Sequence, residues 1–285
     1  MTKETCAPAA QAEKAAAPER SRGGGLKAAF APKGRISKGA ALCLGVLAFL
    51  LILLVWSGIT YGGLVDELFV PTPGKTLAAM LTMFSGDFWG DIGITVIRVM
   101  GGFLIAAVAA IPLGVLVGTY APVASFLEPV FSFVRYMPAS AFIPLFIFWI
   151  GLGENEKMAI IILGSLPQLV LMVAGNIRGV ERDLIEVSYT LGTNQANVLW
   201  KVIFPRALPS IVDTLRIVLG WAWTYVIVAE IVGASSGIGF TILQAQRTVQ
   251  VDKIFVGILT LGFIGLIVDN VLLWLSKKLF PWREA

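Results

Sequence analysis

The sequence predicts an all-α integral membrane protein with six transmembrane helices. Hydrophobic residues make up 57% of the 285 residues, charged residues make up only 14%, and the mean hydropathy is +0.83. These values lie outside the usual range of soluble globular domains. A transmembrane helix needs about 20 consecutive apolar residues. Six mainly apolar runs have about this length or more, at residues 40–61, 92–120, 123–150, 158–177, 211–232 and 254–275.

The first 35 residues contain no apolar run of this kind. They are rich in Ala, Gly, Pro and charged residues, a composition that cannot bury enough apolar surface to offset the entropy of the chain. We therefore expect a disordered cytoplasmic tail at residues 1–35 and a transmembrane domain at residues 36–285. Cys6 and Cys43 are expected to be free thiols, because neither their compartment nor their separation favours a disulfide.

The distribution of lysine and arginine predicts the orientation of the spans. Eight of these residues precede residue 40, against three acidic residues, whereas residues 62–91 contain Lys75 and four acidic residues. Because cytoplasmic loops carry the excess of positive charge, we expect a multi-pass protein with both termini in the cytoplasm. The basic residues lie beside apolar spans without interleaved aromatics, so we expect contact with membrane lipid and not with nucleic acid.

The second and third spans have distinct local features. A short amphipathic run at 76–84 precedes the second span and is expected to lie along the outer membrane surface. Gly114 and Gly118 in the second span have a spacing that lets two helices approach closely. Neighbouring helices must compensate for the prolines that interrupt the third span, which are Pro129, Pro138 and Pro144.

Charged residues inside the spans need a partner, because a charge in hydrocarbon costs a few kcal/mol or more. Arg216 and Glu230 lie in the fifth span about 21 Å apart at the helical rise, so they cannot pair with each other. Each must therefore find water, another span or a solute path, or anchor the span near the membrane interface. The same requirement applies to charged residues of the other spans, including Arg98, Glu128, Arg135 and Asp269.

Several kinds of catalytic chemistry are excluded by residues that are absent. The sequence contains no histidine and two cysteines, which leaves no histidine-based catalysis and no His or Cys metal site. Residues 74–76 resemble the end of a nucleotide-binding P-loop, but Phe69 replaces its first glycine and no strand precedes it. We therefore expect a non-catalytic chain without cofactors or metals, and any ATP that it uses must be bound by another chain.

A polar loop at 178–209 separates the fourth and fifth spans. We expect Asp183 to cap a short helix, Glu186 to lie in its first turn and Gly192 to end it. A second short helix is expected at about 194–203, before Pro205. Such an exposed helix–turn–helix is suited to docking into a groove of a cytosolic partner, and an ordinary amphipathic connector is the alternative.

The spacing of Glu186, Gly192 and Pro205 resembles the EAA loop of ABC-importer permeases. The resemblance extends over residues 91–282, through RYMPASAFIPLFIFWIGLGENEK, LRIVLGWAWTYVIVAEIVG and SSGIGFTI, and it is to the branch that serves nitrate, sulfonate and taurine. Four positions differ from the family motif, and the first two keep residues small enough to pack: Val187, Ser188, Val202 and Phe204.

The resemblance implies a type I ABC-importer permease fold with a cytoplasmic coupling-helix loop, in a bacterial inner membrane. It implies a permease homodimer, two cytosolic ATPase subunits that bind ATP and Mg, and a periplasmic or lipid-anchored solute-binding protein. ATP hydrolysis in the partner would be coupled to alternating access for a small anionic solute of the taurine, sulfonate or nitrate type. The residues expected to contact the ATPase or fix the loop are Glu186, Ser188, Leu191, Gly192, Thr193 and Pro205. The residues predicted to line the solute path are Arg135, Met137, Arg216, Trp221, Trp223 and Glu230.

A secondary transporter or channel without an ATPase partner is the main alternative. It predicts an internal repeat with paired broken helices, but the proline-interrupted third span has no counterpart in the second half of the sequence. A membrane-embedded enzyme is a second alternative. The absence of histidine and of clustered carboxylates within the spans argues against it.

Overall fold

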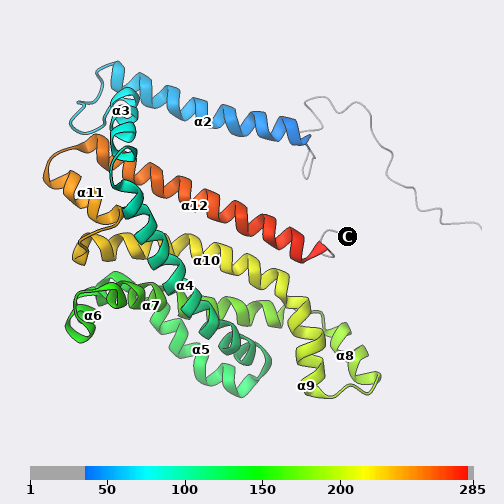
Figure 1. Cartoon of the computed structure of the whole chain (residues 1–285). Helices are drawn as coiled ribbons and strands as arrows, with labels where there is room; N and C mark the ends of the chain where they lie inside the picture. The colour runs from blue at the N-terminus through cyan, green and yellow to red at the C-terminus, as the bar shows by residue number, and fades with distance from the viewer. Residues whose placement is uncertain (1–35, 282–285) are drawn as a thin grey trace, which may run out of the picture. The chain divides into compact units, whose positions relative to one another are not determined.

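Residues 36–281 are described by the computed structural model, and within this range the structure is helical without β-strands. The predicted disordered tail at 1–35 lies outside the described residues. Figure 1 shows the helices, which are α2 (Lys38–Tyr61), α3 (Pro73–Phe84), α4 (Phe88–Thr119), α5 (Ala121–Arg135), α6 (Ile143–Ile150), α7 (Glu154–Arg178), α8 (Arg182–Thr190), α9 (Gln195–Val198), α10 (Phe204–Gly233), α11 (Ile238–Arg247) and α12 (Val251–Leu279). A 3-10 helix (Ala139–Phe142) precedes α6, and a π-helical turn (Leu199–Ile203) precedes α10.

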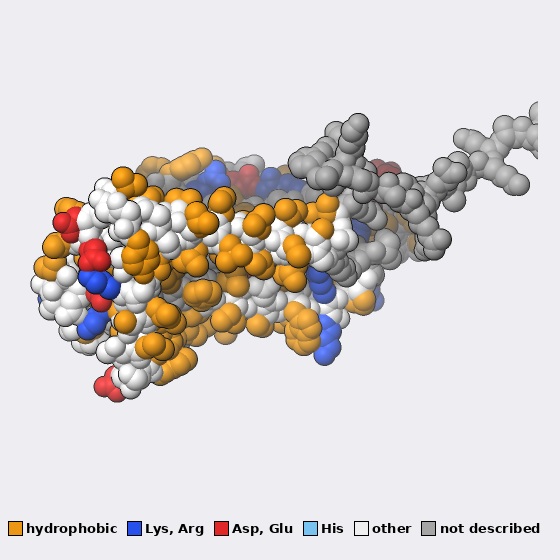
Figure 2. Space-filling view, turned by 90° about the horizontal axis from the view of Figure 1, so that it is seen from above, with side chains coloured by type: hydrophobic (Ala, Val, Ile, Leu, Met, Phe, Trp, Pro, Cys, Tyr) orange, Lys and Arg blue, Asp and Glu red, His pale blue; other side chains and the backbone are white. Residues whose placement is uncertain are grey.

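The predicted membrane architecture is confirmed in the described part of the chain. Five helical segments are long and apolar enough to span a membrane, and α5 with the helices at 139–150 forms a sixth span if this bent pair is counted as one. On the face drawn in Figure 2, orange apolar side chains lie along the length of the helices, acidic and basic side chains lie together at one end, and further basic side chains lie toward the other end. The all-α fold class predicted from the sequence is therefore correct.

The third predicted span is not one straight helix. Its two halves meet at an angle of 84°, and the break lies at Tyr136–Pro138 between α5 and the 3-10 helix. Proline lacks a backbone donor and disfavours the helical conformation of the residue before it, so Pro138 accounts for the break. The other two prolines are accommodated, because Pro129 lies within α5 and Pro144 lies in the first turn of α6.

The described residues fall into two compact units, residues 36–55 and 56–281. The first unit consists mainly of α2 up to residue 55, and α2 is long and apolar enough to span a membrane. The second unit contains the last turns of α2 and all later helices. Its core is formed by apolar side chains of α4, α7 and α10, and the candidate functional residues all belong to it.

The helices α4 and α7 pack closely because α4 carries glycines on the side that faces α7. A Cβ atom on Gly114 would lie 2.6 Å from Val173 Cβ and 2.9 Å from the backbone oxygen of Val170, and one on Gly118 would lie 2.7 Å from Ile177 Cβ. These separations are too short for any side chain. The close approach predicted from the spacing of Gly114 and Gly118 is therefore confirmed.

The amphipathic run at 76–84 is part of α3, but its apolar face packs on protein. Ala79 and Met83 of α3 are buried in one cluster with Phe88, Ile238 and Val256. The amphipathic pattern itself does not distinguish lipid from protein as the apolar neighbour, and the position of this run along the membrane surface stays a prediction. The helix α11, which contributes to the same cluster, was not predicted from the sequence.

The packing predicts opposite effects for alanine at two glycines of α4. Gly114→Ala should lower the thermal unfolding midpoint of the purified protein, because overpacking a helix contact costs about 1–3 kcal/mol. Gly93→Ala should leave the midpoint unchanged or raise it, because nothing lies within 4 Å of a Cβ at Gly93. Equal midpoints for the two variants would contradict the assignment of Gly114 to a close helix contact.

Candidate functional site

The loop between α7 and α10 begins with the exposed helix α8. Glu181 occupies the N-cap position of α8 and makes no side-chain capping bond, and Asp183 lies in the first turn. The predictions that Asp183 caps the helix and that Glu186 lies in its first turn were wrong, because the helix begins at Arg182 and Glu186 is its fifth residue. Asp183 still has a favourable position near the positive end of the helix dipole.

Gly192 ends α8 as predicted. Its φ is +79°, a left-handed conformation that favours glycine. The Gly192 N–H donates to Tyr189 O at 2.9 Å and the Thr193 N–H donates to Ser188 O at 3.1 Å, the two bonds of a Schellman motif. The chain is therefore turned sharply at Gly192, and the direction in which it enters α9 is fixed.

The second helix of the loop does not end before Pro205. Residues Gln195–Gly233 form one continuous helical segment of 39 residues, in which Pro205 lies in the first turn of α10. The prediction that the second helix stops at this proline was wrong. The Phe204 N–H donates to Leu199 O across the π-helical turn, and this wider turn accommodates a proline that donates no backbone hydrogen bond.

The loop buries one side and exposes the other. Val198, Leu199 and Ile203 pack in one cluster with residues of α4 and α7. Leu191 is 79% exposed, and three more large apolar side chains of the loop are at least 47% exposed, those of Val187, Tyr189 and Trp200. Figure 1 shows α8 and α9 at the opposite end of α10 from α11. We call the four exposed side chains the apolar loop patch.

The predicted coupling residues lie in or beside this patch. Glu186, Leu191 and Gly192 are exposed, and Ser188, Thr193 and Pro205 are half-buried. The Ser188 hydroxyl donates to Leu184 O within α8 at 2.6 Å. The structure therefore gathers the first five residues around the turn at Gly192, while Pro205 lies further along at the start of α10.

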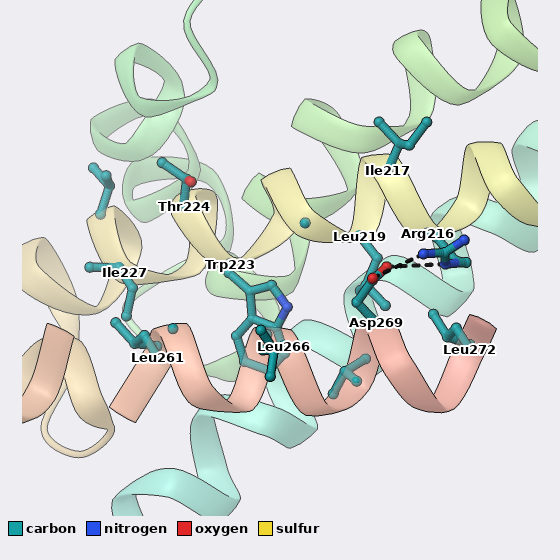
Figure 3. A pocket seen from close by; sticks show the side chains of 15 residues that line it. Arg216, Ile217, Leu219, Trp223, Thr224, Ile227, Leu261, Leu266, Asp269 and Leu272 are labelled. Atoms are coloured by element: carbon teal, nitrogen blue, oxygen red, sulfur yellow. Dashed lines mark hydrogen bonds and ion pairs between the residues drawn. The ribbon is translucent and has the colours of Figure 1, made fainter. Parts of the chain in front are cut away.

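Two of the predicted path residues line a cavity of about 760 Å³ between α10 and α12, shown in Figure 3. Arg216 lies at one end and donates two hydrogen bonds to Asp269 of α12, at 3.0 and 2.9 Å. Trp223 lies in the apolar part of the cavity. Arg216 has therefore found a partner on another span, one of the possibilities that the sequence left open.

The other predicted path residues lie elsewhere. Trp221 is exposed on α10, Arg135 and Met137 are exposed at the break after α5, and Glu230 is completely buried. The Arg135 guanidinium donates to the Tyr136 hydroxyl at 3.0 Å and lies 4.8 Å from the centre of that ring. A role in lining the solute path remains a prediction for all six residues.

Arg135 differs from the other two arginines that the sequence places inside spans. Arg98 and Arg216 each have a carboxylate within ion-pair distance. Arg178 at the end of α7 pairs with Glu128. Among the residues that the structure describes, no carboxylate lies within ion-pair distance of Arg135, whose contacts are with Tyr136.

A buried charge cluster joins α4 to the turn between α10 and α11. Arg98 Nη1 donates to Glu230 Oε1 at 2.8 Å and to Ser236 O at 2.7 Å, and Arg98 also forms a two-pronged ion pair with Glu154 at the start of α7. The side chains of Arg98 and Glu230 are 2% and 0% exposed, whereas that of Glu154 is 56% exposed. The Arg98–Glu230 pair is thus sealed from solvent, and Glu154 closes its outer side.

The same cluster holds the first turn of α11. Glu230 accepts hydrogen bonds from the Gly239 N–H at 2.8 Å and from the Thr95 hydroxyl, which itself accepts from the Ile238 N–H at 2.9 Å. Asp91 accepts from the Gly237 N–H at 2.7 Å and from the Thr241 hydroxyl. These bonds satisfy backbone donors at the start of α11 and place negative charge at the positive end of its dipole.

Lys157 makes a second buried link at the same turn. Its ammonium donates to Gly233 O at the end of α10 at 3.1 Å and to Gly153 O at 3.0 Å. The neighbouring Glu156 lies 3.5 Å away and is also fully buried. The bonds of Lys157 therefore attach α7 to the end of α10 beside the Arg98–Glu230 pair.

Comparison with known proteins assigns the family. The model of the family described as "Binding-protein-dependent transport system inner membrane component" matches residues 110–281. The chain belongs to this family. It is therefore a multi-pass, non-catalytic membrane permease, and this membership favours the importer reading over the secondary transporter and the membrane enzyme.

Similar proteins match the permease along most of its length. A putative aliphatic sulfonates transport permease of Bacillus subtilis is 34% identical, with 85% of this chain and 88% of that protein covered. The taurine transport system permease of Escherichia coli is 30% identical, with 87% and 92% covered. The bicarbonate transport system permease of Synechococcus elongatus is 31% identical, with 82% and 86% covered.

The fold of the permease matches a solved transporter structure. An inward-facing structure of the MetNI methionine ABC transporter aligns with a TM-score of 0.52 and 21% identity. The alignment covers 65% of the permease and 95% of the matched chain. At this identity the likeness establishes the fold, which agrees with the importer permease fold implied by the sequence.

The sequence did not reveal the charge cluster as a unit. Arg98 and Glu230 were recognised separately as charges that need partners, but their separation of 132 residues gives no signal of pairing. Asp91 was read only as an acidic residue outside the membrane. The segment SSGIGFTI, quoted for its resemblance, contains the glycines whose N–H groups bind the carboxylates of Asp91 and Glu230.

Burial predicts unequal effects for removing the two carboxylates that bind Arg98. Glu230→Ala should lower the free energy of unfolding by about 3–5 kcal/mol, because it leaves a buried guanidinium without its buried partner. Glu154→Ala should cost about 1 kcal/mol or less, because Glu154 is half exposed and its interaction is screened. Thermal unfolding of the purified variants checks this order, and an equal or larger loss for Glu154→Ala would contradict it.

Proposed function

We propose that the permease imports a small organic anion of the sulfonate class, such as taurine, as part of an ATP-driven importer. Two copies would form the transmembrane unit in a bacterial inner membrane, with both termini in the cytoplasm. Two cytosolic ATPase subunits would bind ATP and Mg, and a periplasmic or lipid-anchored binding protein would deliver the solute. The permease itself would supply the solute path and the mechanical coupling.

The observation that carries the choice of an anion is the unpaired charge of Arg135. The side chain is exposed at the break between the two halves of the bent span, and no carboxylate among the described residues neutralises it. A guanidinium with free donors suits a sulfonate group, because its planar fork binds pairs of oxygen atoms. Sulfonates and taurine, named for two relatives, carry such a group.

Arg216 is the weaker of the two anion-binding candidates. Asp269 accepts two of its hydrogen bonds and Asp213 lies 3.6 Å away. An anion that approached Arg216 would have to displace Asp269 or be repelled by it. We therefore assign the primary contact with the solute to Arg135, and a role in shaping the path between α10 and α12 to Arg216 and Trp223.

The apolar loop patch supports docking to the ATPase. Its exposed side chains lie on a short rigid elbow, fixed on one side by the Schellman turn at Gly192 and on the other by the buried residues of the loop. An apolar helix face that lies in a hydrophobic groove is a common mode of recognition. A force on this elbow would reach the membrane helices directly, because the helical segment from Gln195 to Gly233 is continuous.

Replacing Arg135 should weaken transport selectively. Arg135→Gln should raise the KM for ATP-driven taurine uptake by about tenfold or more, because a hydrogen-bonded charge contact contributes about 1.5–3 kcal/mol. Arg247→Gln is the matched control, since Arg247 is an exposed arginine at the end of α11. Unaltered uptake in Arg135→Gln, with normal assembly, would exclude Arg135 from the solute path.

The conformation of Gly192 predicts which substitutions preserve ATPase binding. Gly192→Val should abolish co-purification of the ATPase, because a β-branched residue is strained at a φ of +79°. Gly192→Asn should retain the ATPase, because asparagine tolerates the left-handed conformation. Retention of the ATPase by both variants would show that the turn does not position the docking surface.

A further inference from the structure

The charge cluster connects helices that are distant in sequence at one end of the bundle. Arg98 of α4 binds Glu230 near the end of α10, the backbone of Ser236 in the following turn and Glu154 of α7. Lys157 of α7 binds Gly233 O of α10 in addition. Four helices, α4, α7, α10 and α11, therefore meet in one set of charged and polar contacts.

These contacts are expensive to separate. Arg98, Lys157 and Glu230 are 1%, 2% and 0% exposed, so moving the helices apart would leave charges in a site with little access to water. An uncompensated buried charge is strongly unfavourable. In contrast, an exposed ion pair exchanges readily for water. The cluster therefore favours a single arrangement of the helices that it joins.

The helices outside the cluster are less firmly held. In the most apolar stretch of α12, 17% of the residues are buried, compared with 44% in the corresponding stretches of α4 and α7. The cavity of about 760 Å³ separates part of α12 from α10, and a second cavity of about 370 Å³ lies between α5, α6 and α7. These places offer room for relative movement that the cluster does not.

We infer that Arg98, within α4, is a positioning residue. It holds α4, the start of α7, the end of α10 and the start of α11 together as one rigid unit throughout the transport cycle. Alternating access then moves this unit as a whole against α12 and the bent α5–α6 pair. Arg98 acts through Glu230 and the turn at Ser236, and it does not contact the solute. The inference rests on the proposed ATP-driven transport for the existence of the cycle.

The direct test measures a distance within the assembled transporter. Ile97 of α4 and Val232 of α10 are exposed and carry spin labels in one copy of the permease, diluted with unlabelled copies. The distance distribution should be the same in the nucleotide-free and the ATP-trapped assembly. A second pair of labels, at Ile97 and at Ile258 of α12, should change between the two states. A changed Ile97–Val232 distance would overturn the inference.

The variant for the functional test removes both charges, so that no buried charge remains unpaired. In Arg98→Met/Glu230→Gln, the solute transported per ATP hydrolysed should fall by about two- to thirty-fold, the range typical of residues that carry coupling. This ratio is measured on folded assemblies, so a loss of folded protein does not change it. The single variant Arg98→Lys keeps the charge. Its ratio of solute transported to ATP hydrolysed should lie between those of the wild type and the double variant.

The control variant neutralises an exposed ion pair. Glu67→Gln/Lys75→Met removes the pair between Lys75 and Glu67, which are both exposed, and should leave the ratio unchanged. An unchanged ratio in Arg98→Met/Glu230→Gln would overturn the positioning role. If that variant does not fold, the distance measurement on the unmodified cluster decides. Absence of ATP-driven uptake in the wild type would instead contradict the proposed function, which separates the two failures.

Discussion

The buried ion pair between Arg98 and Glu230 is the interaction on which the arrangement of the membrane helices depends. Neither charge is accessible to water, so each is tolerable only while the other is in place. The pair also determines where α11 begins, because Glu230 accepts a backbone hydrogen bond from Gly239. Thr95, Asp91 and the glycines of this turn satisfy the remaining polar groups, so that one end of the bundle is fixed.

The start of α10 adjoins an exposed loop, whereas its end lies beside the buried charge cluster. The helical segment begins at Gln195 in a loop that exposes several large apolar side chains, and it continues to Gly233 beside the charge cluster. At the helical rise, 39 residues correspond to roughly 58 Å. A single element thus links the exposed loop with the buried charges.

Much of this architecture could be predicted from the sequence because hydrophobicity is a local signal. The spans, the close packing at Gly114 and the turn at Gly192 each depend on nearby residues. The pairing of Arg98 with Glu230 depends on the tertiary fold and was not predictable from one sequence. A local rule failed at Pro205, where a π-helical turn replaced the expected helix end.

ATP-driven uptake in proteoliposomes tests the central claim most directly. The permease is reconstituted with its ATPase and binding protein, and uptake of labelled taurine is followed with ATP on the ATPase side, or with a proton or sodium gradient and no ATP. The account predicts uptake that requires ATP and the binding protein and is competed by other small sulfonates. Uptake that follows an ion gradient without ATP would contradict it.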